Sequence, residues 1–155
     1  MLKQVWTTLI LPLLGRPSRF QVAALCYRKT GGAPEILLIT SRETHRWILP
    51  KGWPKAGYDA SGMAAEEAWE EAGVKPRHVS PTPIGQYRYD KRLKGGVPVA
   101  TDVNVFAIEV EALEDHFPEM AERERRWMSP AEAAEAVDEP ELKALLRKLP
   151  AELSA

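Results

Sequence analysis

The sequence predicts an α/β fold in which a mixed sheet carries helices on both faces. Two observations predict this fold. Short apolar runs of strand length alternate along the chain with segments that have helical patterns. Some neighbouring strands are separated only by a tight turn, as in hairpins, so part of the sheet is expected to be antiparallel. The 155 residues fit one domain that can bury a core, and we expect residues 1–155 to form it, with 1–18 as an N-terminal extension.

The composition is that of a soluble globular domain, with 45% hydrophobic and 28% charged residues. The balance of 21 basic against 22 acidic residues gives no global attraction to nucleic acid or to an anionic membrane. The single cysteine, Cys26, excludes an intrachain disulfide, and its apolar neighbours favour a small buried side chain.

An apolar segment at 5–14, interrupted by Pro12, precedes the predicted domain. It is too short to span a bilayer, and no small-residue cleavage site follows it. We therefore expect it to pack on the domain or on a second subunit, as in a homodimer. We expect a cytoplasmic protein.

In the first half of the chain, two apolar runs at 21–27 and 36–40 predict strands of a covered sheet, because a Gly-Gly-Ala-Pro turn separates them. A brief strand is expected at 47–49. Pro50 and Pro54 argue against regular structure between that strand and the next helix.

In the second half, the pattern predicts three more strands, at 84–89, 101–110 and 127–128. In the strand at 101–110, apolar residues occur at both odd and even positions, so we expect both faces of the strand to be buried. Residues 90–98 are typical of a hairpin tip, and residues 116–126 of a polar loop. Two helices should close the chain, one opened by a capping box at Ser129 and one opened by Pro140. Four leucines form the core stripe of the second: Leu142, Leu145, Leu146 and Leu149.

A short helix at 64–72 is the stretch around which the chain is organised. It contains strong helix formers, and Gly73 stands where a left-handed C-terminal cap is favoured. Asp59 or Ser61 can cap the other end. A stripe of small residues suits close packing on a sheet: Ala65, Ala68 and Ala72.

The same helix carries a cluster of carboxylates. Glu67, Glu70 and Glu71 stand at i, i+3 and i+4, so they share one face, with Glu66 beside them. No Lys or Arg between 55 and 75 relieves their repulsion. Such hard oxygen ligands suit Mg²⁺ or Mn²⁺. The plainer interpretation is a solvated acidic face; the glycine loop before the helix and the Gly-Val pair after it favour the metal site.

From Gly52 to Val74 the sequence resembles the signature of the Nudix hydrolases, G-x5-E-x7-R-E-U-x-E-E-x-G-U, where U is aliphatic. The later glutamates of the signature fall on the three just named, and its closing pair falls on Gly73 and Val74. Residues 47–54 and 123–137 are similar to the diphosphoinositol polyphosphate phosphohydrolase branch and its bacterial relatives. The resemblance extends over about 19–149 and implies the Nudix α/β/α sandwich with a mixed central sheet.

Two positions depart from the signature. Its first Glu is Tyr58 here, and its Arg is Glu66. In the family these two residues commonly pair and brace the loop against the helix, so both ends of one salt bridge have changed together. Removing both ends leaves no uncompensated partner.

The resemblance implies Mg²⁺-dependent hydrolysis of a diphosphate linkage in a phosphorylated small molecule, of the diphosphoinositol polyphosphate or dinucleoside polyphosphate type. Glu67, Glu70 and Glu71 are then the metal ligands and the candidate catalytic residues. The general base is one of them or an acid of the loop that holds Glu119, Glu122 and Glu124. The candidate residues for binding the polyanion are Arg42, Lys51, Gly52, Lys91 and Arg92.

The alternative function is a catalytically weakened binding or regulatory module on the same fold, which the changes at Tyr58 and Glu66 favour. The sequence leaves open the natural substrate, the number of metal ions and the oligomeric state. The expected partner is a polyphosphorylated small molecule, not nucleic acid or a membrane.

Overall fold

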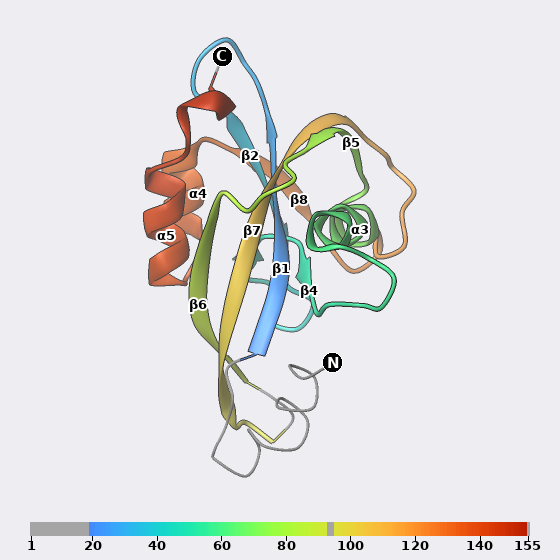
Figure 1. Cartoon of the computed structure of the whole chain (residues 1–155), viewed down its shortest axis with the longest axis vertical. Coiled ribbons are helices and arrows are strands. Elements are labelled where there is room, and N and C mark those ends of the chain that lie inside the picture. Colours follow the sequence, from blue (N-terminus) through green and yellow to red (C-terminus); the bar gives the residue numbers. More distant parts are fainter. Residues whose placement is uncertain (1–18, 93–94, 155) are drawn as a thin grey trace.

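The computed structural model describes residues 19–92 and 95–154. Their strands form an eight-stranded sheet with helices on both faces (Figure 1). The strands are β1 Arg19–Arg28, β2 Glu35–Thr40, β3 Trp47–Ile48, β4 Lys51–Gly52, β5 Val74–Val79, β6 Gly85–Arg92, β7 Pro98–Leu113 and β8 Arg125–Met128. The helices are α3 Ala60–Ala72, α4 Pro130–Ala136, α5 Pro140–Arg147 and the 3₁₀ turn η2 Ala151–Leu153. The predicted N-terminal extension at 1–18 lies outside the described residues.

The sheet is mixed, as predicted. Its main path runs β3-β2-β1-β7-β5, and three further strands pair with members of that path: β4 with β1, β6 with β7, and β8 with β2. The central pair, β1 and β7, is parallel, whereas the other pairs are antiparallel. The long β7 therefore connects the hairpin partner β6 to the middle of the sheet.

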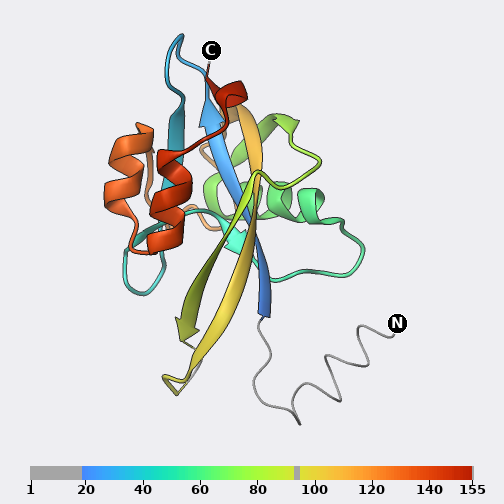
Figure 2. The ribbon, with the colours of Figure 1, turned by 60° about the vertical axis from the view of Figure 1, so that its left-hand side comes forward.

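The two faces of the sheet carry separate cores. In β1, successive side chains alternate: Ala23 and Leu25 face the core under α4 and α5, while Val22, Ala24 and Cys26 face α3. Figures 1 and 2 show α3 on one side of the sheet and the α4–α5 pair on the other. This arrangement confirms the predicted α/β/α sandwich. Burial raises the pKa of the Cys26 thiol, as expected for an inert core side chain.

The organising helix forms for the reasons that its sequence indicates. The side chain of Asp59 accepts a hydrogen bond from the Gly62 backbone N–H at 2.7 Å, which makes Asp59 the N-cap. Gly73 ends the helix in the left-handed conformation with φ of 66°. Ala68 and Ala72 are fully buried against the sheet, whereas Ala65 is only partly buried.

The two closing helices also follow their predicted signals. The Ser129 hydroxyl accepts a hydrogen bond from the Glu132 backbone N–H, and the Glu132 carboxylate accepts one from the Ser129 N–H, so the capping box is confirmed. Pro140 opens α5, and Leu142 and Leu146 are buried, with Leu145 and Leu149 packed at the edge of the same core.

Several elements differ in extent from the sequence predictions; α3, for example, begins at Ala60 rather than at 64. Lys51–Gly52 pairs with β1 as β4, although the flanking prolines predicted irregular structure; neither of the two paired residues is itself a proline, so both keep the N–H that a ladder needs. The strand β5 was not predicted, because Pro76 and polar neighbours hide its pairing with β7, which is interrupted at Pro76. The hairpin strands β6 and β7 run to Arg92 and from Pro98, so the tip is shorter than residues 90–98. No helix within the described residues is long and apolar enough to cross a membrane.

Candidate active site

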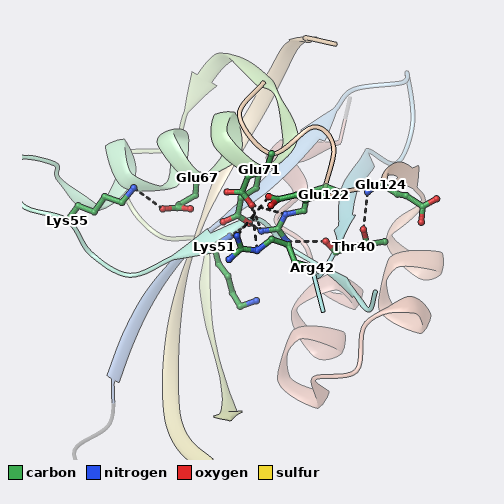
Figure 3. Close-up of polar contacts among 10 residues, drawn as sticks. Thr40, Arg42, Lys51, Lys55, Glu67, Glu71, Glu122 and Glu124 are labelled. Atoms are coloured by element: carbon green, nitrogen blue, oxygen red, sulfur yellow. Dashed lines mark hydrogen bonds and ion pairs between the residues drawn. The ribbon is translucent and has the colours of Figure 1, made fainter. Parts of the chain in front are cut away.

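A cleft of about 1810 Å³ opens beside α3. Its walls come from the loop after β2, from β4 and the loop after it, from one face of α3, from β6, from the loop before β8 and from the first residues of α5. Segments far apart in the sequence therefore meet around one space. Figure 3 shows the part of this region where α3 approaches the loops.

Two carboxylates of α3 are buried at the cleft. Glu67 and Glu71 stand one turn apart and point to the same side of the helix (Figure 3), and both line the cleft, with only 5% and 6% of their surfaces exposed. Glu70, the third predicted ligand, keeps 29% of its side chain exposed at the side of this pair. Glu67 and Glu71 therefore share one face of the helix, and both are buried rather than exposed to water.

The short strand β4 lies directly over these carboxylates. The Lys51 backbone N–H donates to Glu71 Oε1 at 3.4 Å. Gly52 leaves room for the Glu67 carboxylate, since a Cβ at this position would overlap it, with Oε2 only 2.8 Å away. Gly52 was predicted to bind substrate; in the structure its lack of a side chain shapes the carboxylate site.

The counter-charges that α3 lacks come from other elements. Lys55 Nζ lies 3.7 Å from Glu67 Oε1 and 3.5 Å from Glu70 Oε1. On the other side, Arg123 lies 3.4 Å from Glu71 Oε1. The helix itself contains no Lys or Arg. In the folded site, Lys55 from the preceding loop and Arg123 from the loop before β8 relieve the repulsion among the glutamates.

Arg123 is the best-buried cation of this network, with 6% of its side chain exposed. Its Nη2 donates to Glu119 Oε1 at 2.8 Å, and its Nη1 donates to the Thr40 carbonyl at 3.0 Å. Arg123 therefore joins α3, the end of β2 and the loop before β8. Sequence reasoning missed this role, because one Arg in a polar loop gives no signal of its partners.

The acidic loop before β8 contributes unequally. Only Glu119 of its three candidate acids lines the cleft. Its backbone N–H donates to the Glu70 carbonyl at 3.0 Å, which ties the loop to α3. Glu122 is an exposed partner of Arg42 at 3.9 Å, and Glu124 contributes its backbone N–H to Thr40 Oγ1 (Figure 3). Among the three, the position of Glu119 favours it as the loop's candidate general base.

The chemistry of the buried pair fits a divalent cation. Burial, reinforced by a hydrogen bond with Glu67, raises the pKa of Glu71 to about 8, while Arg123 opposes the shift. Two buried carboxylates that share a proton are donors from which a cation can displace that proton. The described residues do not hold three or more such ligands already assembled around one point. Glu70 would complete the set by turning away from Lys55.

Lys51 lies in the same cleft as a partly desolvated cation. Burial lowers its pKa to about 8, against the opposing charges of Glu139 and Glu71. Its ammonium lies 5.5 Å from the centre of the Tyr89 ring. The other predicted anion-binding residues, Arg42, Lys91 and Arg92, also line the cleft, where the Arg92 side chain donates to the Gly96 carbonyl at 2.9 Å. The structure thus brings together every predicted site residue except Glu70, which borders the cleft.

The two positions that depart from the Nudix signature do not form a pair in the structure. Tyr58 is half exposed in the loop before α3. Among the described residues, no hydrogen bond or ion pair joins it to Glu66, which lies beside Glu70 on the helix. The salt bridge that braces the loop against the helix in the family is therefore absent between these two positions. Arg123 instead ties α3 to the end of β2 and to the loop before β8.

Comparison with known proteins identifies the family of this fold. The NUDIX domain family model matches residues 17–149. Nudix hydrolase 13, mitochondrial, from Arabidopsis thaliana is 32% identical over 110 residues, covering 65% of this chain and 52% of that protein. Diphosphoinositol polyphosphate phosphohydrolase 3-alpha from Mus musculus is 38% identical over 55 residues, covering 36% of this chain and 34% of that protein. The chain thus spans about half, or less, of the length of these curated relatives.

Solved structures share the fold. The Ap4A hydrolase of C. elegans superimposes with a TM-score of 0.61 at 22% identity, covering 84% of this chain and 95% of that one. A Nudix hydrolase from Nitrosomonas europaea gives a TM-score of 0.65 at 15% identity, covering 84% and 87%. The extent of the family match, together with the retained glutamates of α3, shows that the chain belongs to the Nudix family.

Proposed function

We propose that this protein is a divalent-metal-dependent hydrolase that cleaves a diphosphate linkage in a polyphosphorylated small molecule. One observation carries the proposal: α3 presents the buried Glu67–Glu71 pair to a cleft that also contains several cations. Mg²⁺ is the expected ion, with Mn²⁺ as the alternative, because hard oxygen donors and phosphate oxygens suit both.

Glu67, Glu70 and Glu71 would hold the cation. It would supply Lewis acidity toward a phosphoryl oxygen and lower the pKa of a water nucleophile. The chain's own groups do the rest. Lys51, Arg42 and the hairpin cations bind the anionic chain of the substrate, and Glu119, held by Arg123, is positioned to accept a proton from water.

The finer substrate class is either a diphosphoinositol polyphosphate or a dinucleoside polyphosphate. The curated relatives named for the first and the structural relatives named for the second support these two classes. Lys91 and Arg92 at the end of β6 are expected to raise the affinity most for the most highly charged substrate. We further propose that residues 1–155 form one domain and that the protein is cytoplasmic, with a homodimer as the assembly to test.

The most informative experiment is phosphate or nucleotide release from a panel of diphosphate compounds, with and without Mg²⁺. Replacing Glu70 by Gln removes one charged ligand and keeps its shape, so the rate should fall by about two orders of magnitude or more, as for other interactions made in a transition state. The matched control is Glu66→Gln, which makes the same chemical change one position outside the ligand set. Equal rates for both variants at saturating Mg²⁺ would contradict the assignment.

The second candidate function is a Nudix-fold binding module with little turnover. Two observations favour it: the absent brace between Tyr58 and Glu66, and the contacts of Lys55 with two of the three predicted ligands. These ion pairs are long, and Lys55 is half exposed, so a divalent cation can displace it at little cost. Saturable binding of a polyphosphate without hydrolysis, with Mg²⁺ or Mn²⁺ present, would identify this function instead.

A further inference from the structure

One carboxylate of the cleft has acceptor capacity that the protein does not use. Glu139 precedes the first turn of α5, lines the cleft and is only 5% exposed. Its Oε1 has no hydrogen-bond partner, and its Oε2 reaches Arg46 Nη1 only at 3.7 Å, beyond hydrogen-bond range. Its side chain does not cap the helix either. A buried carboxylate in this state is costly, and a donor supplied by a ligand would recover that cost.

The surroundings of Glu139 restrict what this donor can belong to. Asp138 and Glu141 flank it in the same wall, and Glu141 accepts from the Arg88 backbone N–H at 3.1 Å. In the same cleft, the Tyr89 hydroxyl donates to Gln21 Oε1 at 2.6 Å, and the Lys51 ammonium lies 5.5 Å from the Tyr89 ring. Arg46 is the cation paired with Asp138 and Glu139, and these two carboxylates together with Glu141 outnumber it, so a phosphate group is expected to lie toward α3 rather than beside Glu139.

The total charge of the cleft argues against a substrate that carries phosphates on all sides. Among the described residues that line it, acidic side chains are as numerous as basic ones. A ring that carries phosphates on all sides would need a surplus of cations on every wall. A nucleoside attached to a phosphate chain needs cations at one end and hydrogen-bond acceptors at the other.

We propose that Glu139 accepts a hydrogen bond from the nucleoside end of a nucleoside or dinucleoside polyphosphate, and so determines the substrate class. This inference rests on the proposed hydrolase function and chooses between its two substrate classes. The donor is an N–H of the base or an O–H of the ribose, since a carboxylate accepts a hydrogen bond from either group.

The test compares full-length variants toward two probes, diadenosine tetraphosphate and inorganic tripolyphosphate, which lacks a nucleoside. Glu139→Leu removes the acceptor and Glu139→Gln removes only its charge. Glu139→Leu should raise KM for diadenosine tetraphosphate by about tenfold to hundredfold, for the loss of a bond to a charged group, and Glu139→Gln by less, because its amide oxygen still accepts; neither should change KM for tripolyphosphate much. The matched control is Glu135→Gln, which changes an exposed carboxylate of α4 that pairs with Arg147 outside the cleft, and it should leave both values unchanged.

Analogues of the substrate then locate the donor. Replacing adenine by hypoxanthine removes the exocyclic amine, and 2′-deoxyribose removes one hydroxyl. The analogue whose disadvantage disappears in Glu139→Leu identifies the group that Glu139 binds. An unchanged KM for diadenosine tetraphosphate in both Glu139 variants would overturn the inference, as would an equal rise for tripolyphosphate, which would mean that the variants only disturb the fold.

Binding calorimetry separates this inference from the proposed function. If the wild-type protein hydrolyses no diphosphate compound but binds diadenosine tetraphosphate, and Glu139→Leu weakens that binding selectively, the subsite stands while the hydrolase proposal fails. If the protein hydrolyses diphosphoinositol polyphosphates and neither binds nor hydrolyses nucleoside polyphosphates, the hydrolase proposal stands and the subsite is overturned.

Discussion

The two ends of the cleft hold buried carboxylates in opposite conditions. At the α3 end, Glu71 receives a backbone N–H from β4, a hydrogen bond with Glu67 and an ion pair with Arg123. At the α5 end, Glu139 has one long ion pair and an oxygen without a partner. Both residues are almost fully buried, so exposure to water does not explain the difference.

The contrast indicates that the protein fixes one end and leaves the other for a ligand. Carboxylates that must hold an ion in one geometry benefit from partners that orient them before the ion arrives. A carboxylate that recognises a substrate through a hydrogen bond must keep an oxygen free to accept that bond. The cleft therefore combines carboxylates that are oriented by partners at the α3 end with a carboxylate at the α5 end that has an oxygen free to accept a hydrogen bond.

The largest effect is expected from removing the cation that orients the α3 end. Arg123→Met should lower the free energy of unfolding by roughly 3–5 kcal/mol, because breaking a buried ion pair leaves Glu71 and Glu119 without their shared partner. Urea unfolding measures this directly. Arg147→Met is the matched control: Arg147 pairs with Glu135 on the exposed surface, and its loss should cost about 0.2–1 kcal/mol. Equal costs for the two variants would show that the α3 end is not specially braced.

A smaller effect, on rate rather than stability, is expected at Gly52. A methyl group there would displace the Glu67 carboxylate while leaving the β4 backbone free to pair. Gly52→Ala should therefore reduce kcat by about a hundredfold, the order expected for a misplacement near 1 Å. Gly32→Ala, in an open turn with nothing within 4 Å of the added carbon, should leave kcat unchanged. A fully active Gly52→Ala protein would mean that Glu67 can move without consequence.

The fold was largely predictable because its signals are local. Asp59, Gly73, the Ser129 capping box and the leucines of α5 act within a few residues, and each behaves as predicted. The strands β4 and β5 were not predicted, since their pairing depends on partners elsewhere in the chain and their composition is poor for strands.

The site was predictable only in part, for the same reason. Helical spacing placed the three glutamates on one face, and the glycine loop before the helix favoured a metal site there. The burial of that face, its pairing with Arg123 and the unpartnered oxygen of Glu139 arise from loops that meet only after folding. A single Arg or Glu in a polar loop has no periodicity from which its environment could be inferred.

A third prediction concerns the proton held at the α3 end. The pKa of Glu71 is about 8 in the folded, metal-free protein against 4.5 for an exposed side chain, so folding retains a proton that the unfolded chain releases. The contribution of Glu71 to the stability of the metal-free protein should therefore fall as pH rises from about 4.5 to about 8 and then level off. Thermal unfolding across this range measures the slope.

Two comparisons sharpen that measurement. Glu71→Gln should flatten the slope, whereas Glu135→Gln, at an exposed position, should leave it intact. Saturating Mg²⁺ should also flatten the slope, since a bound ion that replaces the proton removes the dependence of stability on that proton. A slope that persists in Glu71→Gln would assign the proton to another group.

The smallest predicted effect concerns Lys51, which feels the charge of both Glu71 and Glu139 and so connects the two ends. Its pKa of about 8 in the free protein means that it loses its charge above that pH, when it can no longer attract a phosphate. With Mg²⁺ saturating, kcat/KM for a polyphosphate substrate, which reports free-enzyme groups, should decline above about pH 8. Lys51→Arg should remove the decline, because Arg stays charged throughout this range. Lys75→Arg makes the same change outside the cleft and should preserve the decline. If Lys51→Arg declines as the wild type does, Lys51 is not the titrating group, and the anionic chain must be bound by the arginines of the cleft instead.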